Sequence, residues 1–217
     1  MKHSGIKVIA IDFDGTLVES NHIKDRAFET IFSEWPEHKK SMMEWHYKHN
    51  AIDRREKFRY FVEDVLFLSD DKLIEELTMR FSGLTKQGVI ACPFVKGTLH
   101  FLDYIKDWSI NYLVSATPQK ELNDIIYNRG LKKFFKKVYG APIDKVEILK
   151  KIMTNENVSI NEILYIGDSP EDQDAAEILG INFIGRQSDR ILNGDLNNIY
   201  LDFYKIKDHL LKVYSLR

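Results

Sequence analysis

The sequence predicts an α/β fold in which a parallel sheet is flanked by helices and a separate helical segment follows the first strand. Three observations support this prediction. Residues 8–11 (VIAI) are apolar without alternation, which is typical of a strand buried on both faces of a parallel sheet. Similar runs recur late in the chain with helical patterns between them. Residues 19–90 contain helical patterns and no strand pattern.

The remaining expected strands are short apolar runs that end in turn signals. They are residues 110–114, 163–166 and 181–184. Helical patterns separate the strands at residues 98–107, 119–128, 144–153 and 171–179. Strands that alternate with helices in this way predict a parallel sheet with right-handed crossovers.

The helical segment predicts a second domain. Apolar residues repeat with helical spacing in three of its runs, around residues 27–32, 58–65 and 73–81. We therefore expect one domain formed by residues 1–18 and 91–217 and another formed by residues 19–90. The connections between the two domains would lie side by side and can act as a hinge.

Composition excludes several functional classes. The chain has 217 residues, 31 Lys and Arg and 33 Asp and Glu, and a net charge of −2, which does not favour binding to nucleic acid. Cys92 is the only cysteine, which excludes an intramolecular disulfide and a zinc-cysteine cluster. No stretch approaches the roughly 20 apolar residues of a membrane span. We expect a reduced, soluble, cytoplasmic protein with no nucleic-acid or membrane partner.

Polar side chains follow three of the expected strands. Asp12 and Asp14 follow the first, Ser115 follows the second, and Asp168 and Asp172 follow a later one. Ligands of open α/β sheets bind beyond the carboxyl ends of the strands, so these groups should meet there. Carboxylates brought together raise one another's pKa unless a cation is present. Mg²⁺ suits such an oxygen site, and the sequence has no set of His or Cys that favours zinc.

The first acidic pair has a spacing that suits covalent phosphoryl transfer. Asp12 and Asp14 are two residues apart and point to the same side if the chain stays extended, and Gly15 permits a sharp turn after them. One carboxylate can then be the nucleophile that forms an aspartyl phosphate, and its neighbour can be the acid and base. The alternative is an Asp-Gly turn without a catalytic role.

Two further positions are candidates for phosphate binding. Ser115 ends a strand, and Thr117 as N-cap with Pro118 at the first helical position would start a helix whose N-terminus binds anions. Lys145, near the start of another helix, can neutralise the phosphate and the nucleophile together. The alternatives are a serine that only ends a strand and a lysine exposed to solvent.

Residues 167–172 (GDSPED) predict a helix start next to a metal ligand. Ser169 and Asp172 have the spacing of a capping box, with Pro170 at the first helical position. Asp168 precedes the cap and is the better metal ligand. Asp172 can orient a ligand or a metal-bound water.

These motifs resemble those of the haloacid dehalogenase-like (HAD) hydrolase superfamily over essentially the full chain. Residues 12–17 (DFDGTL) match motif I, Ser115 matches motif II and Lys145 matches motif III. Residues 167–172, with Ala175, Ala176 and Gly180 after them, match motif IV. The resemblance implies a three-layer, Rossmann-like core with a parallel sheet, an inserted all-helical cap domain, and Mg²⁺-dependent phosphoryl transfer.

The resemblance also implies a role for each site residue. Asp12 would be the nucleophile and Asp14 the acid/base, while Asp12, Asp168 and the backbone carbonyl of Asp14 would bind the metal. The remaining expected site residues are Ser115, Ala116 and Lys145 for phosphate, and Thr16 and Asp172 as supports of the metal ligands.

The helical segment resembles the small cap of the phosphoglycolate phosphatase and β-phosphoglucomutase branch, where the cap decides substrate specificity. Residues 51–54 (AIDR) resemble its specificity loop, with Ala51 where glycine is usual. Arg54 would bind distal anionic or hydroxyl groups of the substrate. Lys24 occupies a cap position that often faces the pocket. The alternative for both side chains is a solvated helix surface.

The function expected from these features is an Mg²⁺-dependent phosphatase that hydrolyses a small phosphorylated metabolite. The main alternative is a sugar-phosphate mutase of the β-phosphoglucomutase type. A phosphonate hydrolase would need a Schiff-base lysine, for which only Lys24 is a candidate. A binding protein on a degenerate hydrolase fold is disfavoured because every catalytic position is filled, and a dehalogenase because Asp14 is present.

Three other patterns have simple structural interpretations. The basic residues at 132–133 and 136–137 are expected to be a solvated helix end rather than a nucleic-acid site. His46 and His49 are expected to be a surface pair rather than zinc ligands. The aromatic residues Trp35, Trp45 and Tyr47 are expected in the core of the helical segment.

Overall fold

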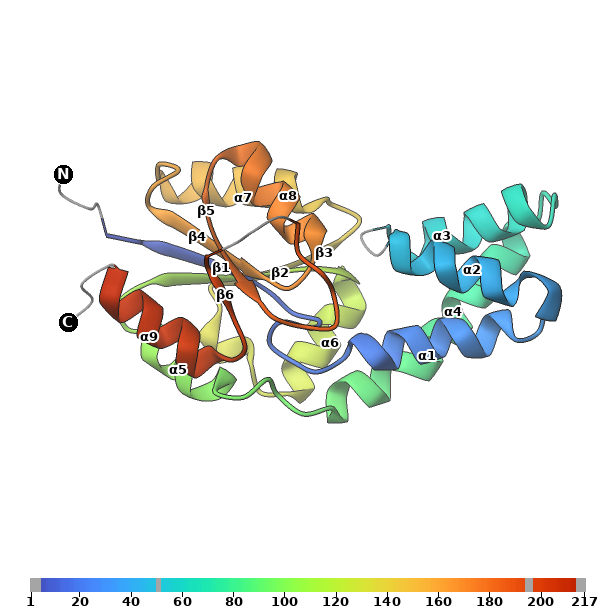
Figure 1. Ribbon diagram of the computed structural model, residues 1–217, viewed down its shortest axis with the longest axis horizontal. Helices are drawn as coiled ribbons and strands as arrows, with labels where there is room; N and C mark the ends of the chain where they lie inside the picture. The colour runs from blue at the N-terminus through green and yellow to red at the C-terminus, as the bar shows by residue number, and fades with distance from the viewer. Residues whose placement is uncertain (1–4, 50–51, 194–196, 214–217) are drawn as a thin grey trace. The chain divides into compact units, whose positions relative to one another are not determined.

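The computed structural model describes residues 5–49, 52–193 and 197–213. The chain divides into two compact units. Unit 1 comprises Met1–Glu19 and Pro93–Arg217, and unit 2 comprises Ser20–Cys92. Figure 1 labels the elements of both units along the chain.

Unit 1 is built on a parallel sheet whose strand order is β3-β2-β1-β4-β5-β6. Its strands are β1 (Val8–Asp12), β2 (Ile110–Pro118), β3 (Lys137–Ala141), β4 (Ile163–Gly167), β5 (Asn182–Arg186) and β6 (Ile199–Tyr200). All five residues of β1 are buried, as its unbroken apolar pattern predicts. The predicted α/β class with a parallel sheet and an inserted helical segment is confirmed.

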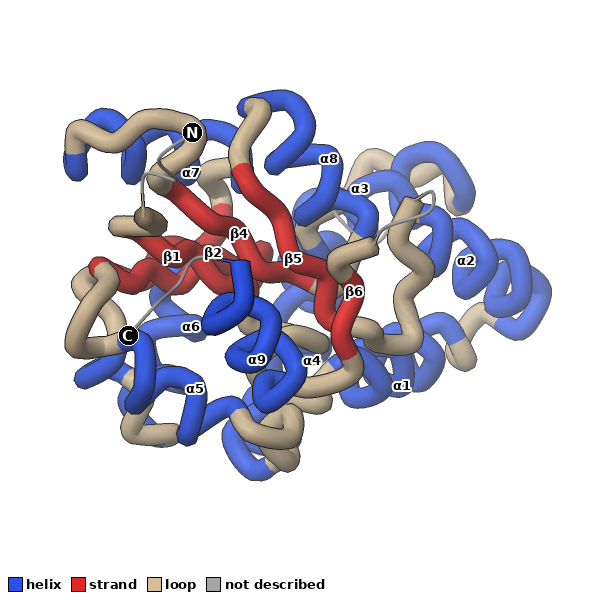
Figure 2. Tube along the Cα trace, turned by 60° about the vertical axis from the view of Figure 1, so that its left-hand side comes forward, coloured by secondary structure: helices blue, strands red, loops and turns tan. Residues whose placement is uncertain are grey.

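Helices cover both faces of this sheet, with α7 and α8 on one face and α5 and α9 on the other (Figure 2). The helices of unit 1 are α5 (Thr98–Ile105), α6 (Gln119–Asn128), α7 (Lys145–Glu156), α8 (Pro170–Leu179) and α9 (Phe203–Val213). Ile148, Leu149 and Ile152 of α7 pack with Ala10 of β1 in one buried apolar cluster. On the opposite face, α5 and α9 contact each other.

The register of the central strands brings their carboxyl ends to one level. Asp12 at the end of β1 pairs with Val114 of β2, and Ile11 pairs with Ile166 of β4. Ser115 comes directly after Val114, and Asp168 is separated from Ile166 by one residue. The polar residues of three strands therefore meet at one edge of the sheet, as the rule for open α/β sheets requires.

Two local predictions in unit 1 are wrong. The helix after β2 begins at Gln119 with Pro118 as N-cap and no side-chain cap, because β2 continues to Pro118, which pairs with Ala141. Thr117 is therefore a strand residue and not an N-cap. The basic run is not a helix end: a 3₁₀ turn (Lys132–Phe134) leads into β3, which starts at Lys137.

Unit 2 contains helices and, among its described residues, no strand. Its elements are α1 (Asn21–Phe32), α2 (Pro36–Lys48), α3 (Arg54–Tyr60), a π-helical turn (Phe61–Val65) and α4 (Asp71–Ala91). Asp53 and Asp70 cap α3 and α4 by accepting hydrogen bonds from the backbone N–H groups of Arg55 and Leu73.

An aromatic cluster forms the core of unit 2. Phe28, Phe32, Phe58 and Phe81 are buried together, and the rings of Phe28 and Phe81 lie 4.3 Å apart. Edge and tilted contacts between such rings stabilise the packing beyond the burial of apolar area. Because α1, α3 and α4 each contribute a ring, the cluster joins three of the helices.

The histidine and aromatic predictions in this unit need correction. His46 is buried rather than on the surface, and its Nε2 lies 2.9 Å from Oδ1 of Asp25 and its Nδ1 2.9 Å from Nζ of Lys57. Trp45 packs partly buried against the core, whereas Tyr47 is half exposed and is not a core residue.

No helix among the described residues has the length and apolar character to cross a membrane.

Candidate active site

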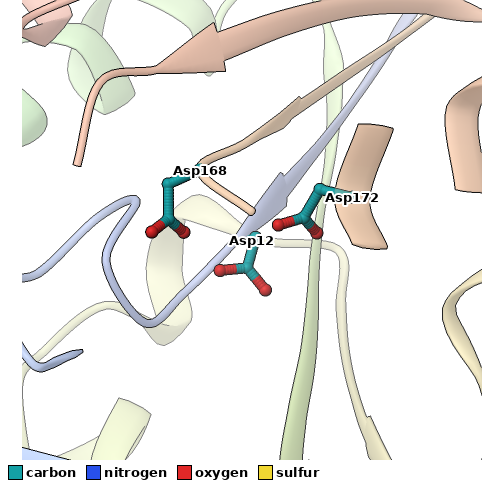
Figure 3. A group of neighbouring side chains, drawn as sticks. All are labelled: Asp12, Asp168 and Asp172. Atoms are coloured by element: carbon teal, nitrogen blue, oxygen red, sulfur yellow. The ribbon is translucent and has the colours of Figure 1, made fainter. Parts of the chain in front are cut away.

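Three buried carboxylates converge at the carboxyl end of the central strands (Figure 3). Asp12 is the last residue of β1, Asp168 follows β4, and Asp172 lies in the first turn of α8. One oxygen from each carboxylate lies within 4.8 Å of those of the other two. The sheet and the start of α8 thus bring together acidic groups that are far apart in sequence.

Thr16 contacts two carboxylates that are distant in sequence. Its buried hydroxyl lies 2.9 Å from Oδ1 of Asp168 and 3.3 Å from Oδ2 of Asp12. The turn that returns Thr16 to the strand ends places Gly15 at φ 75°, a backbone conformation that glycine adopts without a steric penalty. One hydroxyl therefore lies between the two carboxylates and can donate its proton to either of them.

Asp14 points to a different set of partners from Asp12. Its Oδ2 accepts a hydrogen bond from Oγ1 of Thr117 at 3.0 Å and lies 3.4 Å from Oγ of Ser115. Ser115 is buried, and its Oγ also accepts the backbone N–H of Thr117 at 3.0 Å. Thr117 is a site contact that the sequence analysis missed, because its pattern there indicated a helix cap.

Lys145 is the first residue of α7 and bridges two of the carboxylates. Its Nζ donates to Oδ1 of Asp12 at 3.0 Å and to Oδ1 of Asp172 at 2.5 Å. An ammonium group between two buried carboxylates offsets part of their repulsion. The lysine at this position is therefore not a solvated surface residue.

Protein donors occupy both oxygens of Asp172. Oδ1 accepts hydrogen bonds from Lys145 and from the hydroxyl of Tyr165, and Oδ2 accepts from Oγ of Ser169 at 2.7 Å and from its backbone N–H at 3.2 Å. The predicted capping box is present. A Cβ atom at Gly167 would overlap the Asp172 carboxyl, so only glycine permits this close approach.

Burial and neighbouring charges shift the pKa values of the central pair. Burial raises the pKa of the Asp12 carboxyl well above its usual range; Lys145 opposes the shift, and Asp172, Asp168 and Asp14 add to it. Burial lowers the pKa of Lys145, but Asp12 and Asp172 outweigh it, so its pKa is raised and the group stays an ammonium. The carboxylates outnumber this one cation, and their oxygen donors suit a hard divalent ion such as Mg²⁺.

A family model of haloacid dehalogenase-like hydrolases matches residues 9–186. The chain belongs to this hydrolase family. The matched region contains Asp12, Asp14, Ser115, Lys145 and Asp168, and the resemblance noted in the sequence is confirmed. No curated protein matches this hydrolase.

Solved structures similar to this hydrolase share its fold. A predicted phosphoglycolate phosphatase from Haemophilus somnus 129PT is 17% identical, with 94% of this chain and 97% of that chain covered and a TM-score of 0.73. CbbY from Rhodobacter sphaeroides in complex with xylulose-1,5-bisphosphate is 13% identical, with 91% and 95% covered and a TM-score of 0.71. YfnB, a HAD-hydrolase from Bacillus subtilis bound to magnesium, is 14% identical, with 95% and 99% covered and a TM-score of 0.69.

Arg54 and Lys24, the two residues of unit 2 that are expected to contact substrate, differ in burial. Arg54 is buried, its Nη1 donates to Oγ of Ser82 at 2.9 Å, and its guanidinium lies 5.1 Å from the centre of the Phe81 ring. It is therefore not on a solvated helix surface. Lys24 on α1 is half-buried, and Ala51 lies outside the described residues.

Arg186 is a second contact that sequence reasoning missed. It ends β5, its Nη1 donates to the backbone carbonyl of Gly15 at 2.9 Å, and it forms an ion pair with Glu19. Arg186 thus holds the loop that follows the proposed nucleophile. Its place at the end of an expected strand was the available signal, since the other site residues also follow strands.

Proposed function

We propose that this hydrolase is an Mg²⁺-dependent phosphatase that releases phosphate from a small phosphorylated metabolite through an aspartyl phosphate on Asp12. The observation that supports the proposal most directly is the pairing of Asp12 with Lys145 beside Asp168. A carboxylate held against an ammonium is oriented for attack, and Lys145 opposes the rise that burial causes in the pKa of Asp12. Asp14, two residues further along, lies against a different group, the hydroxyl of Thr117.

The reaction follows two steps on this chain's residues. Asp12 attacks phosphorus through one carboxylate oxygen, the ester P–O bond breaks, and Asp14 in its acid form gives a proton to the leaving oxygen. A water molecule then loses a proton to Asp14 and attacks phosphorus, the acyl phosphate P–O bond breaks, and phosphate leaves. Asp12 returns to its carboxylate form and Asp14 to its acid form.

The remaining site residues would bind the phosphate and the metal. Lys145 and Ser115 donate hydrogen bonds to phosphate oxygens, and Ala116 borders the same group at the end of β2. Asp12, Asp168 and the backbone carbonyl of Asp14 would hold Mg²⁺. The bound ion supplies positive charge that offsets the charge of the phosphate.

We also propose that unit 2 is a cap domain that selects the substrate and that unit 1 is the catalytic core. The sequence predicts the cap at residues 19–90 and the core at residues 1–18 and 91–217. Arg54 would bind an anionic or hydroxyl group of the substrate, and Lys24 would contact it as well. The bond to Ser82 and the contact with Phe81 support this role, because a guanidinium with a fixed orientation loses less entropy on binding.

The similarity to CbbY, which binds a sugar bisphosphate, favours phosphorylated sugars within this substrate class and retains the alternative of a sugar-phosphate mutase. A mutase would use the same nucleophile and acid/base but return the phosphoryl group to the sugar. Release of inorganic phosphate distinguishes the two activities. Isomerisation of a sugar phosphate without release would favour the mutase.

The proposal is tested with a panel of phosphorylated metabolites and p-nitrophenyl phosphate, assayed with Mg²⁺ and with a chelator. We expect phosphate release that needs Mg²⁺ and is lost in the Asp12→Asn variant while the fold, measured by circular dichroism, is retained. Full activity in Asp12→Asn, or no turnover of any member by the native chain, would overturn it.

A further inference from the structure

Two tyrosines flank Ala10 in the sheet and support equivalent networks. Ala10 of β1 pairs in register with Tyr112 of β2 and with Tyr165 of β4. Residues at one level of neighbouring parallel strands point to the same face of the sheet. Both tyrosines accordingly lie in the one apolar cluster that α7 covers.

Each tyrosine hydroxyl donates to a carboxylate oxygen that also accepts a hydrogen bond from a lysine. Tyr112 donates to Oε1 of Glu156, which accepts from Nζ of Lys136 at 2.6 Å. Tyr165 donates to Oδ1 of Asp172, which accepts from Lys145 at 2.5 Å. The chemistry of the two networks is the same.

The two networks differ in what the lysine contacts next. Lys145 also donates to Asp12, the proposed nucleophile, at 3.0 Å. Lys136 pairs with Glu156, whose carboxylate lies at the opposite end of α7 from Lys145. Only the Tyr165 network therefore ends on the reacting group.

We propose that Tyr165 is a positioning residue that holds the Lys145 ammonium against Asp12 by way of Asp172, an inference that rests on the proposed phosphatase function. The hydroxyl of Tyr165 and the cap of Ser169 bind opposite oxygens of the Asp172 carboxylate. A carboxylate bound at both oxygens cannot rotate freely, so Oδ1 keeps facing Lys145. Lysine has a flexible four-carbon stem, and its ammonium needs such a fixed acceptor to keep one position.

Burial strengthens this constraint. The side chains of Tyr165 and Asp172 are fully buried, so solvent does not compete for their hydrogen bond. Burial, followed by the Asp172 charge, raises the pKa of Tyr165 well above its usual range, so the hydroxyl stays protonated and remains a donor.

The test compares Tyr165→Phe with the matched control Tyr112→Phe, using p-nitrophenyl phosphate and saturating Mg²⁺. Each variant loses one hydrogen bond to a carboxylate, which is buried for Tyr165 and part-buried for Tyr112, and we expect both to lower the melting temperature by ~2–4 °C. Only Tyr165→Phe should lower kcat, by about tenfold, with KM changed less than about threefold, because the misplaced ammonium affects the attack more than binding. Equal kcat values in the two variants would overturn the proposal.

A double-mutant cycle tests whether Tyr165 acts through Lys145. In a Lys145→Met background, Tyr165→Phe should change kcat/KM by less than about twofold, since no ammonium remains to be positioned. A full, multiplicative loss in that background would contradict the assignment. Crystal structures add a readout that needs no turnover: the Lys145 ammonium should leave Asp12 or occupy several rotamers in Tyr165→Phe, and keep its place in Tyr112→Phe.

Failure of the inference is distinguishable from failure of the proposed function. If the native chain hydrolyses the probe and Tyr165→Phe equals Tyr112→Phe in kcat and in the position of Lys145, only the role of Tyr165 is wrong. If the native chain hydrolyses neither the probe nor any phosphorylated metabolite, the phosphatase proposal is wrong and the role of Tyr165 in it falls too.

Discussion

The Nζ atom of Lys145 lies 3.0 Å from Oδ1 of Asp12, although 133 residues separate the two in the sequence. This contact couples the first residue of α7 to the last residue of β1. A cation at this position can offset the charge of the proposed nucleophile and that of an approaching phosphate, which otherwise repel each other. The contact therefore relates the fold of unit 1 directly to the proposed chemistry.

Replacement of this lysine tests the contact itself. Lys145→Met should lower kcat/KM by about 10²–10³-fold, as the loss of one charged donor in a buried site does. Lys145→Arg should not restore the activity, because a planar guanidinium cannot occupy the place of a compact ammonium between two carboxylates. Steady-state kinetics with p-nitrophenyl phosphate measure both. Activity of Lys145→Arg near the native value would mean that only the charge at this position matters.

Asp12, the proposed nucleophile, should destabilise the metal-free protein. The raised pKa of Asp12 has burial as its first cause and shows that the ionised carboxylate is unfavourable in the fold. Asp12→Asn removes that charge, so we expect the variant to melt ~2–4 °C higher than the native chain in chelator at about pH 7. Melting curves measured with and without Mg²⁺ check this.

Added Mg²⁺ should reverse the order of the melting temperatures, so that the native chain melts above Asp12→Asn. An ion present at about 100 times its Kd stabilises the native chain by about 2.7 kcal/mol, and the variant, which lacks one ligand charge, should gain less. A variant that melts below the native chain in chelator would show that the bond between Asp12 and Lys145 outweighs the cost of the buried charge.

Thr16 should influence metal affinity rather than the chemical step. Its hydroxyl contacts both Asp12 and Asp168, the two carboxylates proposed to bind Mg²⁺. Thr16→Val keeps the shape and removes the hydroxyl, so the Mg²⁺ concentration for half-maximal activity should rise about 10–100-fold, with kcat at saturating Mg²⁺ nearly unchanged. Thr78→Val, which removes a part-buried hydroxyl that donates to the backbone carbonyl of Ile74 in α4, is the control and should leave this concentration unchanged.

Acid should weaken the connection between β1 and β4. The ion pair with Lys7 and hydrogen bonds from Ser159 lower the pKa of Glu162 from 4.5 to about 2. A carboxyl whose pKa is lower in the folded state stabilises the fold above its ordinary pKa, and that contribution is lost as the pH falls from about 4.5 to about 2.

Glu162→Gln isolates this contribution. The native chain should melt above the variant at about pH 6, and the difference should shrink steadily as the pH falls through the range given above. Thermal melts at a series of pH values measure it, and Glu162 titrations by NMR locate the pKa directly. A difference in melting temperature that is constant with pH would contradict the lowered pKa. High salt should reduce the effect, because Lys7 is largely exposed.

Local sequence determined the elements whose signals lie within a few residues. The apolar run at residues 8–11 predicts a strand that is buried on both faces, and β1 has that burial. The capping box of Ser169 and Asp172 lies within one helical turn, and α8 starts there as predicted. The sequence also predicts the position and the chemistry of the acidic cluster, because parallel strands bring their carboxyl ends to one edge of the sheet.

Tertiary structure alone decided the partners of these residues. Thr117 donates to Asp14 instead of capping a helix because β3 extends the pairing of β2 to Pro118. Tyr165 meets Asp172 only because Gly167 lets the start of α8 approach the strand closely. His46 is buried because Asp25 and Lys57 supply hydrogen-bond partners from other helices. Each of these depends on contacts between segments distant in sequence, which local periodicity and capping rules do not encode.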